Sequence, residues 1–136
     1  MSTTVVKMSD AMLWEIPDPE PNHRYMGIMF ERDITPTANL ASGFVILPPK
    51  QEQQRLSVHE GQEEVYFVAK GKGRFVLDEE TVDVDQGTAV YIKPGCRHRA
   101  INTGDEEMVL FYVNTPPVFG PVGAYKELTK NWKRIR

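Results

Sequence analysis

The chain has 136 residues, a length that corresponds to one domain with a single hydrophobic core. Hydrophobic residues make up 40% and charged residues 26%, a composition typical of globular proteins that argues against disorder of the whole chain. The formal net charge of -3 attracts no polyanion, so a nucleic-acid partner is not expected. We therefore expect one domain over residues 1–136 with one site for a small molecule.

Cysteine content and the N-terminal residues bear on the compartment. Cys96 is the only cysteine, which excludes an internal disulfide and a zinc site built from several cysteines. The first residues lack the apolar core of a secretory signal, and no apolar run approaches the length of about 18 residues needed to cross a membrane. We expect a cytoplasmic protein with no membrane partner.

Short runs rich in Val, Ile, Tyr and Phe, separated by Gly, Pro, Asp and Asn, follow one another along the chain. The first covers residues 11–16, and the proline-rich segment 17–23 after it can hold neither a strand ladder nor a helix interior. Eight or nine short strands at this spacing predict an all-β sandwich or barrel. The later runs cover residues 24–33, 42–49, 64–71, 74–80, 81–87, 89–95, 97–102 and 107–114.

The C-terminal residues show a different spacing. Apolar residues recur there at gaps of three and four, which predicts a short amphipathic helix over about residues 123–135. Basic residues lie off this apolar face and near the end of the helix, where they oppose its dipole, so we interpret them as a solvated surface. The apolar positions are Tyr125, Leu128, Trp132 and Ile135, and the basic ones are Lys126, Lys130, Lys133 and Arg134.

Histidine and carboxylate residues gather in one segment before a predicted strand. His59 precedes Glu64, and Gly61 between them permits a bend that could bring the imidazole and the carboxylate to one centre. Because side chains alternate along a strand, Tyr66 and Val68 share the face of Glu64. Histidines and a carboxylate at this spacing are the side chains that a metal site requires.

A second segment supplies another histidine. Pro94 and Gly95 predict a tight turn, and the strand after it places His98 and Asn102 on one face.

These two segments resemble the paired motifs of the cupin superfamily, over about residues 51–71 and 87–102. In that family the first motif has two histidines one residue apart, then a glutamate and a glycine, and the second has glycines, a proline, a histidine and an asparagine. The resemblance implies a double-stranded β-helix, or jelly-roll barrel, with its site in the barrel mouth and, here, a short C-terminal helix. The matching residues are His59, Glu64, Gly71, Gly87, Gly95, His98 and Asn102.

Three positions depart from the family pattern. Ser57 stands where the first histidine belongs, Gln51 replaces the leading glycine, and Lys93 replaces the usual proline, with Pro94 one place later. A neutral hydroxyl is a poor metal ligand, so we interpret Ser57 as a contact to the other ligands or to the substrate.

The resemblance implies a divalent transition metal held by His59, Glu64 and His98. Two imidazoles and one carboxylate favour Fe(II), and could also hold Mn, Ni, Zn or Cu with open positions for substrate. Two alternatives stay open from the residues alone. The three side chains could form a buried polar network, or they could line a ligand pocket without metal.

Two further residues are candidates for catalysis. Arg55 alternates with Ser57, so its guanidinium could face the interior and bind a carboxylate or phosphate, or it could lie in solvent at the strand end. Tyr66 could orient the substrate through its hydroxyl, or its ring could simply fill the barrel.

Other residues near the motifs receive simpler interpretations. We assign Tyr91 and Phe111 to the core and Cys96 to a small buried apolar position. Strand phase points Glu63 toward solvent, while Glu60 could replace the missing ligand only if its loop curls inward.

Cupins include dioxygenases, decarboxylases, lyases, isomerases and epimerases, so the resemblance gives a site and not a reaction. It implies a small metal-binding cupin, and an enzyme, either a dioxygenase-like oxidoreductase or a lyase, that acts on a small oxygenated or carboxylated compound. The alternative, favoured by Ser57, is a non-catalytic ligand-binding or sensor cupin. We also expect a homodimer, because cupin barrels usually pair and residues 11–16 offer an apolar strand.

Overall fold

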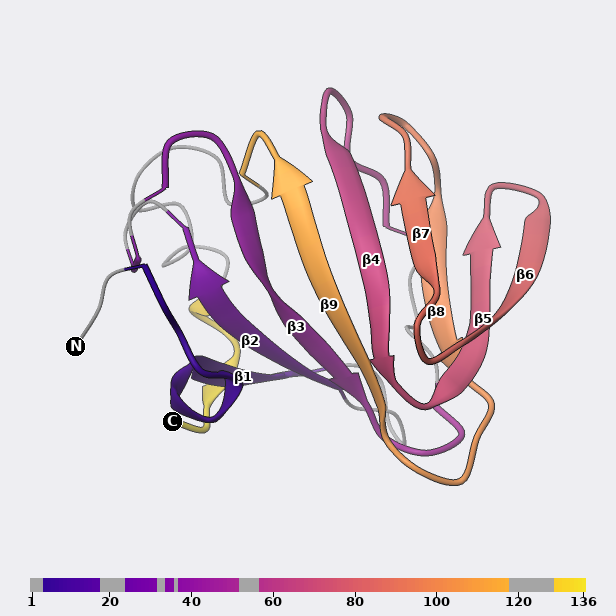
Figure 1. The fold of residues 1–136 in the computed structure, drawn as a ribbon, viewed down its shortest axis with the longest axis horizontal. Coiled ribbons are helices and arrows are strands. Elements are labelled where there is room, and N and C mark those ends of the chain that lie inside the picture. Colours follow the sequence, from indigo (N-terminus) through magenta and orange to yellow (C-terminus); the bar gives the residue numbers. More distant parts are fainter. Residues whose placement is uncertain (1–3, 18–23, 32–33, 36, 52–56, 118–128) are drawn as a thin grey trace.

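The computed structural model describes residues 4–17, 24–31, 34–35, 37–51, 57–117 and 129–136, and it is built almost entirely from strands (Figure 1). A short 3-10 helix, η1 (Met8–Asp10), precedes the first strand. The strands are β1 (Met12–Ile16), β2 (Arg24–Phe30), β3 (Ala41–Leu47), β4 (Glu63–Lys70), β5 (Lys72–Leu77), β6 (Glu80–Asp85), β7 (Ala89–Ile92), β8 (His98–Asn102), β9 (Met108–Thr115) and β10 (Lys133–Arg134).

The strands form two sheets in which every neighbouring pair is antiparallel. Seven strands make the larger sheet in the order β10-β1-β2-β3-β9-β4-β7, and three make the smaller one in the order β6-β5-β8. Figure 1 shows the strands of the larger sheet side by side from β1 to β7, with β5, β6 and β8 of the smaller sheet on the right. Non-consecutive neighbours such as β3 and β9 are the long-range pairings of a jelly roll, so the predicted all-β barrel is confirmed. The nine strands read from the sequence up to residue 115 are all present.

The main core lies between the two sheets and follows the alternation of the strands. On β4, Glu64, Tyr66 and Val68 point inward and are buried, while Val65 and Phe67 point outward and are more than 40% exposed. The inward side chains of β4, β5, β8 and β9 pack in one apolar cluster. The barrel therefore gives the polar residues on its inward faces a dry environment.

The C-terminal residues correct one prediction. Lys133 and Arg134 form β10, which pairs with β1 through Glu15 and Trp14, and the Arg134 guanidinium lies 5.2 Å from the centre of the Trp14 ring. Residues 123–128 of the predicted helix lie outside the described residues, and the helix expected at residues 132–135 is wrong. Pairing with the open edge of β1 satisfies backbone groups that one helical turn would leave in water.

A separate finding concerns membranes. Within the part of the chain that the structure describes, we find no helix long and apolar enough to span a bilayer.

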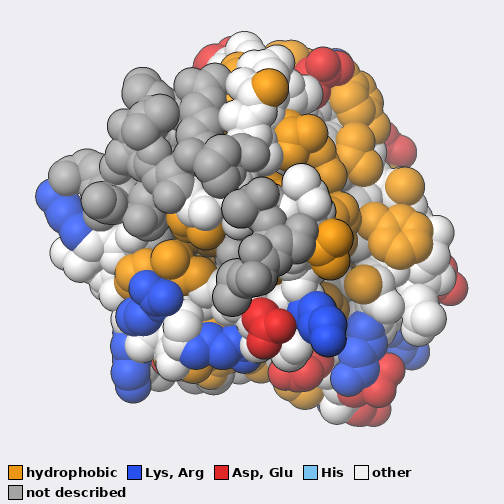
Figure 2. Space-filling view, turned by 60° about the vertical axis from the view of Figure 1, so that its left-hand side comes forward, with side chains coloured by type: hydrophobic (Ala, Val, Ile, Leu, Met, Phe, Trp, Pro, Cys, Tyr) orange, Lys and Arg blue, Asp and Glu red, His pale blue; other side chains and the backbone are white. Residues whose placement is uncertain are grey.

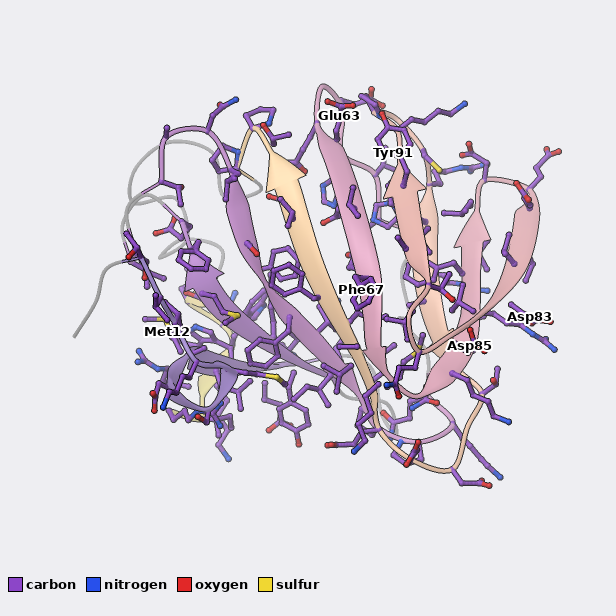
Figure 3. All side chains as sticks on the ribbon, in the orientation of Figure 1. Met12, Glu63, Phe67, Asp83, Asp85 and Tyr91 are labelled. Carbon is purple, nitrogen blue, oxygen red and sulfur yellow. The ribbon has the colours of Figure 1, made fainter. Side chains whose placement is uncertain are left out.

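The outer face of the larger sheet carries an apolar patch, which corrects a second prediction. Tyr91 is 56% and Phe111 36% exposed, so neither belongs to the core to which the sequence assigned it. Both sit on outward positions of their strands, beside Val65 and Phe67. Figure 3 shows Phe67 and Tyr91 on adjacent strands, and Figure 2 shows hydrophobic side chains gathered on the right of the molecule. The sequence does not show which face of a strand another element covers, so the assignment of both residues to the core is wrong.

Candidate metal centre

Three side chains that are separated in the sequence meet at one point inside the barrel. His59, Glu64 and His98 each offer a ligand atom, and these atoms all lie within 4.8 Å of one another. Glu64 comes from β4 of the larger sheet and His98 from β8 of the smaller sheet, while His59 lies in the segment before β4. The structure thus brings together the three residues that the sequence predicted as metal ligands.

His98 is fixed by its own turn. The residue is 1% exposed, and its Nδ1 lies 3.0 Å from the carbonyl oxygen of Cys96. A carbonyl only accepts, so Nδ1 carries the hydrogen and donates it. The neutral ring then presents the lone pair of Nε2 to the interior, which is the arrangement that a metal-binding histidine adopts.

Glu64 is fixed in the same way from β9. Its side chain is buried, and Asn114 Nδ2 donates to its Oε2 over 3.1 Å. Its other oxygen, Oε1, lies 3.3 Å from His98 Nε2. The contact is an ion pair when the ring is protonated, and neither atom has a hydrogen-bond partner among the described residues.

The bonding of Glu64 Oε1 and His98 Nε2 shows whether the residues of the centre fit a metal. Two buried polar atoms without hydrogen bonds are costly unless a proton on Nε2 or a cation that takes both lone pairs satisfies them. Each residue uses its second polar atom to hold its orientation, and each leaves the atom facing the centre uncommitted. The donor set of two imidazole nitrogens and one carboxylate oxygen fits a divalent transition metal.

His59 completes the set from a loop. Its ring centre lies 5.4 Å from that of His98, and its backbone carbonyl accepts a hydrogen bond from Gly95 N over 3.2 Å. Gly61 has a φ of 69°, so the bend expected between His59 and Glu64 is present at a residue that adopts it without strain. His59 is only half-buried, and it marks the edge of the centre that faces solvent.

The environment shifts the two histidines in opposite directions. Burial lowers the pKa of His59, and His98 lowers it further, while the Glu64 carboxylate opposes both. Burial alone would lower the pKa of His98 too. There the Glu64 carboxylate and the Cys96 carbonyl together outweigh burial, and the pKa of His98 is raised above 6.5.

Two tyrosines border the centre. Tyr66 is 7% exposed, and its ring centre lies 6.2 Å from that of His98, so it faces the interior as predicted. Burial and the Glu64 carboxylate raise the pKa of Tyr66 well above its ordinary value. Tyr112 lies opposite it on β9, fully buried, and burial with the Glu64 and Glu31 carboxylates raises its pKa as well. Both hydroxyls therefore stay protonated and can donate hydrogen bonds.

The remaining candidates from the sequence lie elsewhere. Arg55 lies outside the described residues. Glu60 and Glu63 are exposed, and Glu63 accepts a hydrogen bond from the Tyr91 hydroxyl over 2.7 Å on the outer surface. Cys96 is buried within the main apolar cluster, and burial raises the pKa of its thiol, which agrees with the predicted apolar position.

Asn102, the last residue of the second motif, holds a loop and not the centre. Its Nδ2 donates to the carbonyl oxygens of Leu47, Pro48 and Glu106 over 2.9, 3.0 and 2.9 Å. The asparagine that touches a ligand is Asn114, which sequence reasoning missed. Strand alternation places Asn114 on the inward face of β9, and a polar residue at an inward position was the available signal.

Comparisons with known proteins agree with this fold. The sequence profile of the cupin domain family matches residues 43–114. An uncharacterized protein of Methanocaldococcus jannaschii is 30% identical over 69 residues, which cover 51% of this chain and 55% of that protein. A glucose-6-phosphate isomerase of Thermococcus onnurineus is 33% identical over 69 residues, which cover 47% of this chain and 36% of the isomerase. The chain thus spans about half, or less, of the length of these relatives.

Among solved structures, a predicted oxalate decarboxylase from Thermotoga maritima has the same fold. It superposes with a TM-score of 0.72 at 22% identity, and the match covers 82% of this chain and 98% of that one.

Proposed function

The chain belongs to the cupin family, and from that premise we propose that it is a metal-dependent enzyme acting on a small oxygenated or carboxylated compound. The observation that carries the proposal is the cluster of His59, Glu64 and His98, whose ligand atoms all lie within 4.8 Å of one another. Within it, Glu64 Oε1 and His98 Nε2 face one another at 3.3 Å and have no hydrogen-bond partner among the described residues. Fe(II) is the favoured metal because two imidazoles and one carboxylate are the facial set of non-haem iron sites, and Mn, Ni, Zn and Cu are the alternatives.

Different residues have different roles in this proposal. His59, Glu64 and His98 would hold the metal, and Asn114 keeps the Glu64 carboxylate turned toward it. When bound, the metal acts as a Lewis acid that polarises a substrate oxygen. Tyr66, buried and protonated beside Glu64, would donate a hydrogen bond that orients the substrate.

The relatives support the class of compound. Glucose-6-phosphate isomerase and oxalate decarboxylase are named for small, oxygen-rich, anionic substrates. A dioxygenase-like, lyase or isomerase reaction on such a compound is consistent with a centre that has open positions.

Turnover measurements test this proposal. Protein loaded with Fe(II), Mn(II) or Co(II) would be incubated with oxalate, glucose 6-phosphate and a panel of small hydroxy acids and sugars, and products followed by NMR. Turnover that disappears in His98→Ala supports the enzyme. Metal-dependent binding without turnover for any compound would favour the non-catalytic ligand-binding cupin instead.

The single cysteine leads us to propose the cytoplasm as the compartment.

A further inference from the structure

A cavity of about 510 Å³ lies away from the metal centre, where the N-terminal residues meet β2 and the C-terminal residues. We call it the N-terminal cavity, and none of the three candidate metal ligands lines it. In the larger sheet, β3 and β9 separate β2 from β4, which carries Glu64, and Figure 1 shows β1 and β2 on the left beside both ends of the chain. Its volume is in the range of small-molecule pockets, about 300–1,000 Å³.

The walls of the N-terminal cavity are mostly apolar. Met12 of β1 pairs with Ile28 of β2, and the register between β2 and β3 shifts between Ile28 and Phe30. Bulges of this kind often lie beside binding sites, where they re-aim side chains. Ile28 and Met29 both line the cavity at this irregularity, and Val5 is among the residues that complete the apolar wall. The cavity can therefore bury the apolar body of a ligand.

The polar lining of the N-terminal cavity is mainly cationic. Lys7, Arg134 and Arg136 line it, against a single acidic side chain, Asp10. Among the described residues, these three cations form no salt bridge. In a chain whose formal net charge is -3, this is a local site that attracts an anion.

Hydrogen bonds to the backbone hold the two arginines in place. Arg136 donates from Nε to Ala11 O over 3.2 Å and from Nη2 to Met8 O over 2.8 Å. Arg134 donates from Nε to Arg136 O over 2.7 Å. Each guanidinium has further N–H groups beyond those used here, which remain to bind a ligand. An anion would thus meet donors whose positions are already fixed, which lowers the entropic cost of binding.

We propose that the N-terminal cavity binds a small amphipathic carboxylate, a molecule with an apolar body and one carboxylate group. The apolar body packs against Met12, Met29 and the other wall residues, and the carboxylate binds Arg134 and Arg136, whose planar forks match it. Asp10 on the same lining repels a doubly charged phosphate more than a singly charged carboxylate. The proposal is independent of the proposed function, because it uses no residue of the metal centre.

Titration with octanoate tests the proposal. Metal-free protein is used, so that the carboxylate cannot bind a metal at the centre. Calorimetry measures the affinity, and amide shifts in NMR spectra locate the site. We expect octanoate to bind with a dissociation constant below about 1 mM and to shift amides of residues that line the cavity. The alcohol 1-octanol, which lacks the charge, should bind at least about tenfold more weakly.

Three substitutions separate the charge from the apolar wall. Arg134→Gln should weaken octanoate at least about fivefold and leave octanol unchanged. Lys133→Gln is the matched control, because Lys133 is the exposed neighbour of Arg134 on β10 and does not line the cavity, so its octanoate affinity should stay within about twofold of the wild type. Val5→Asp, at a residue that is 67% exposed, should weaken both ligands without unfolding the protein.

Four results would overturn the proposal. The first is the absence of heat and of amide shifts with octanoate up to about 10 mM. The second is equal affinity for octanoate and octanol. The third is equal loss of octanoate affinity in Arg134→Gln and Lys133→Gln, because the effect would then come from net charge. The fourth is a set of shifted amides that lies outside the cavity.

Discussion

Replacing Asn114 with alanine separates the positioning of Glu64 from the rest of the fold. Asn114 is fully buried and donates to Glu64 Oε2 over 3.1 Å, and this contact turns the other carboxylate oxygen toward His98. A hydrogen bond to a charged group contributes about 1.5–3 kcal/mol, and loss of a partner that holds a metal ligand typically lowers metal affinity about 10–100-fold. We expect Asn114→Ala to bind Co(II) weaker by that factor.

Asn102 provides a matched control, because it is equally buried but its side chain, within the part of the chain that the structure describes, hydrogen-bonds only to backbone groups. Its Nδ2 contacts three carbonyl oxygens, and its Oδ1 accepts from Gly104 N over 2.9 Å. At about 0.5–1.5 kcal/mol for each of these four hydrogen bonds, Asn102→Ala should lose about 2–6 kcal/mol of unfolding free energy. The fraction that remains folded should bind Co(II) like the wild type.

Two measurements on each variant decide the question. Urea unfolding of the metal-free proteins gives the free energy of unfolding, and competition with a chelator of known affinity gives the Co(II) dissociation constant. The reasoning is refuted if Asn114→Ala binds Co(II) as tightly as the wild type. It is also refuted if folded Asn102→Ala loses as much affinity as Asn114→Ala, because the effect would then come from general loosening of the barrel.

Three further outcomes are expected. The pKa of His98 is raised above 6.5, and Co(II) must displace the proton of the ring in order to bind. The affinity for Co(II) should therefore rise with pH until His98 is neutral and then level off. Titrations between about pH 6 and 8 that show constant affinity would contradict this expectation. A Cβ on Gly43 would lie 2.0 Å from Gly27 O, so Gly43→Ala should lower the free energy of unfolding in urea by about 3 kcal/mol. Gly104→Ala, whose Cβ would make ordinary contacts at 3.5 Å, should lower it by less than about 1 kcal/mol. Equal losses in the two variants would refute the packing argument. The homodimer stays a prediction, but apolar residues of 11–16 such as Leu13 and Ile16 are buried within the chain and their strand already pairs with β2 and β10, so the surface we now expect it to cover is the apolar patch of β4, β7 and β9. Sedimentation velocity should show a dimer that Phe67→Glu converts to monomer, and a monomeric wild type would contradict the prediction.

The strands and the ligands could be predicted because their signals are local. Alternation along β4 placed Glu64 and Tyr66 inward and Phe67 outward, and the burial of these three residues agrees. The bend at Gly61 and the turn at Gly95 also follow from residues that permit positive φ. The sequence thus predicts His59, Glu64 and His98 as one set, and their ligand atoms lie within 4.8 Å of one another.

The structural features that could not be predicted from the sequence depend on contacts between distant segments of the chain. Lys133 and Arg134 pair with β1 although the spacing of apolar residues there is helical. The local sequence does not indicate a strand partner that lies more than a hundred residues away. The exposure of Tyr91 and Phe111 depends on whether another element covers that face. Asn114 acquired its role only through the register between β9 and β4, which sets it opposite Glu64.

The most direct test of the metal centre is the metal content of the protein itself. Wild-type protein and His98→Ala would be purified without added metal, reloaded with Fe(II), Mn(II), Ni(II), Zn(II) or Cu(II), freed of excess by gel filtration, and measured by elemental analysis. The centre described here predicts a near-stoichiometric transition metal in the wild type and its loss in a folded His98→Ala variant. A wild type that retains no metal under any of these conditions would contradict it.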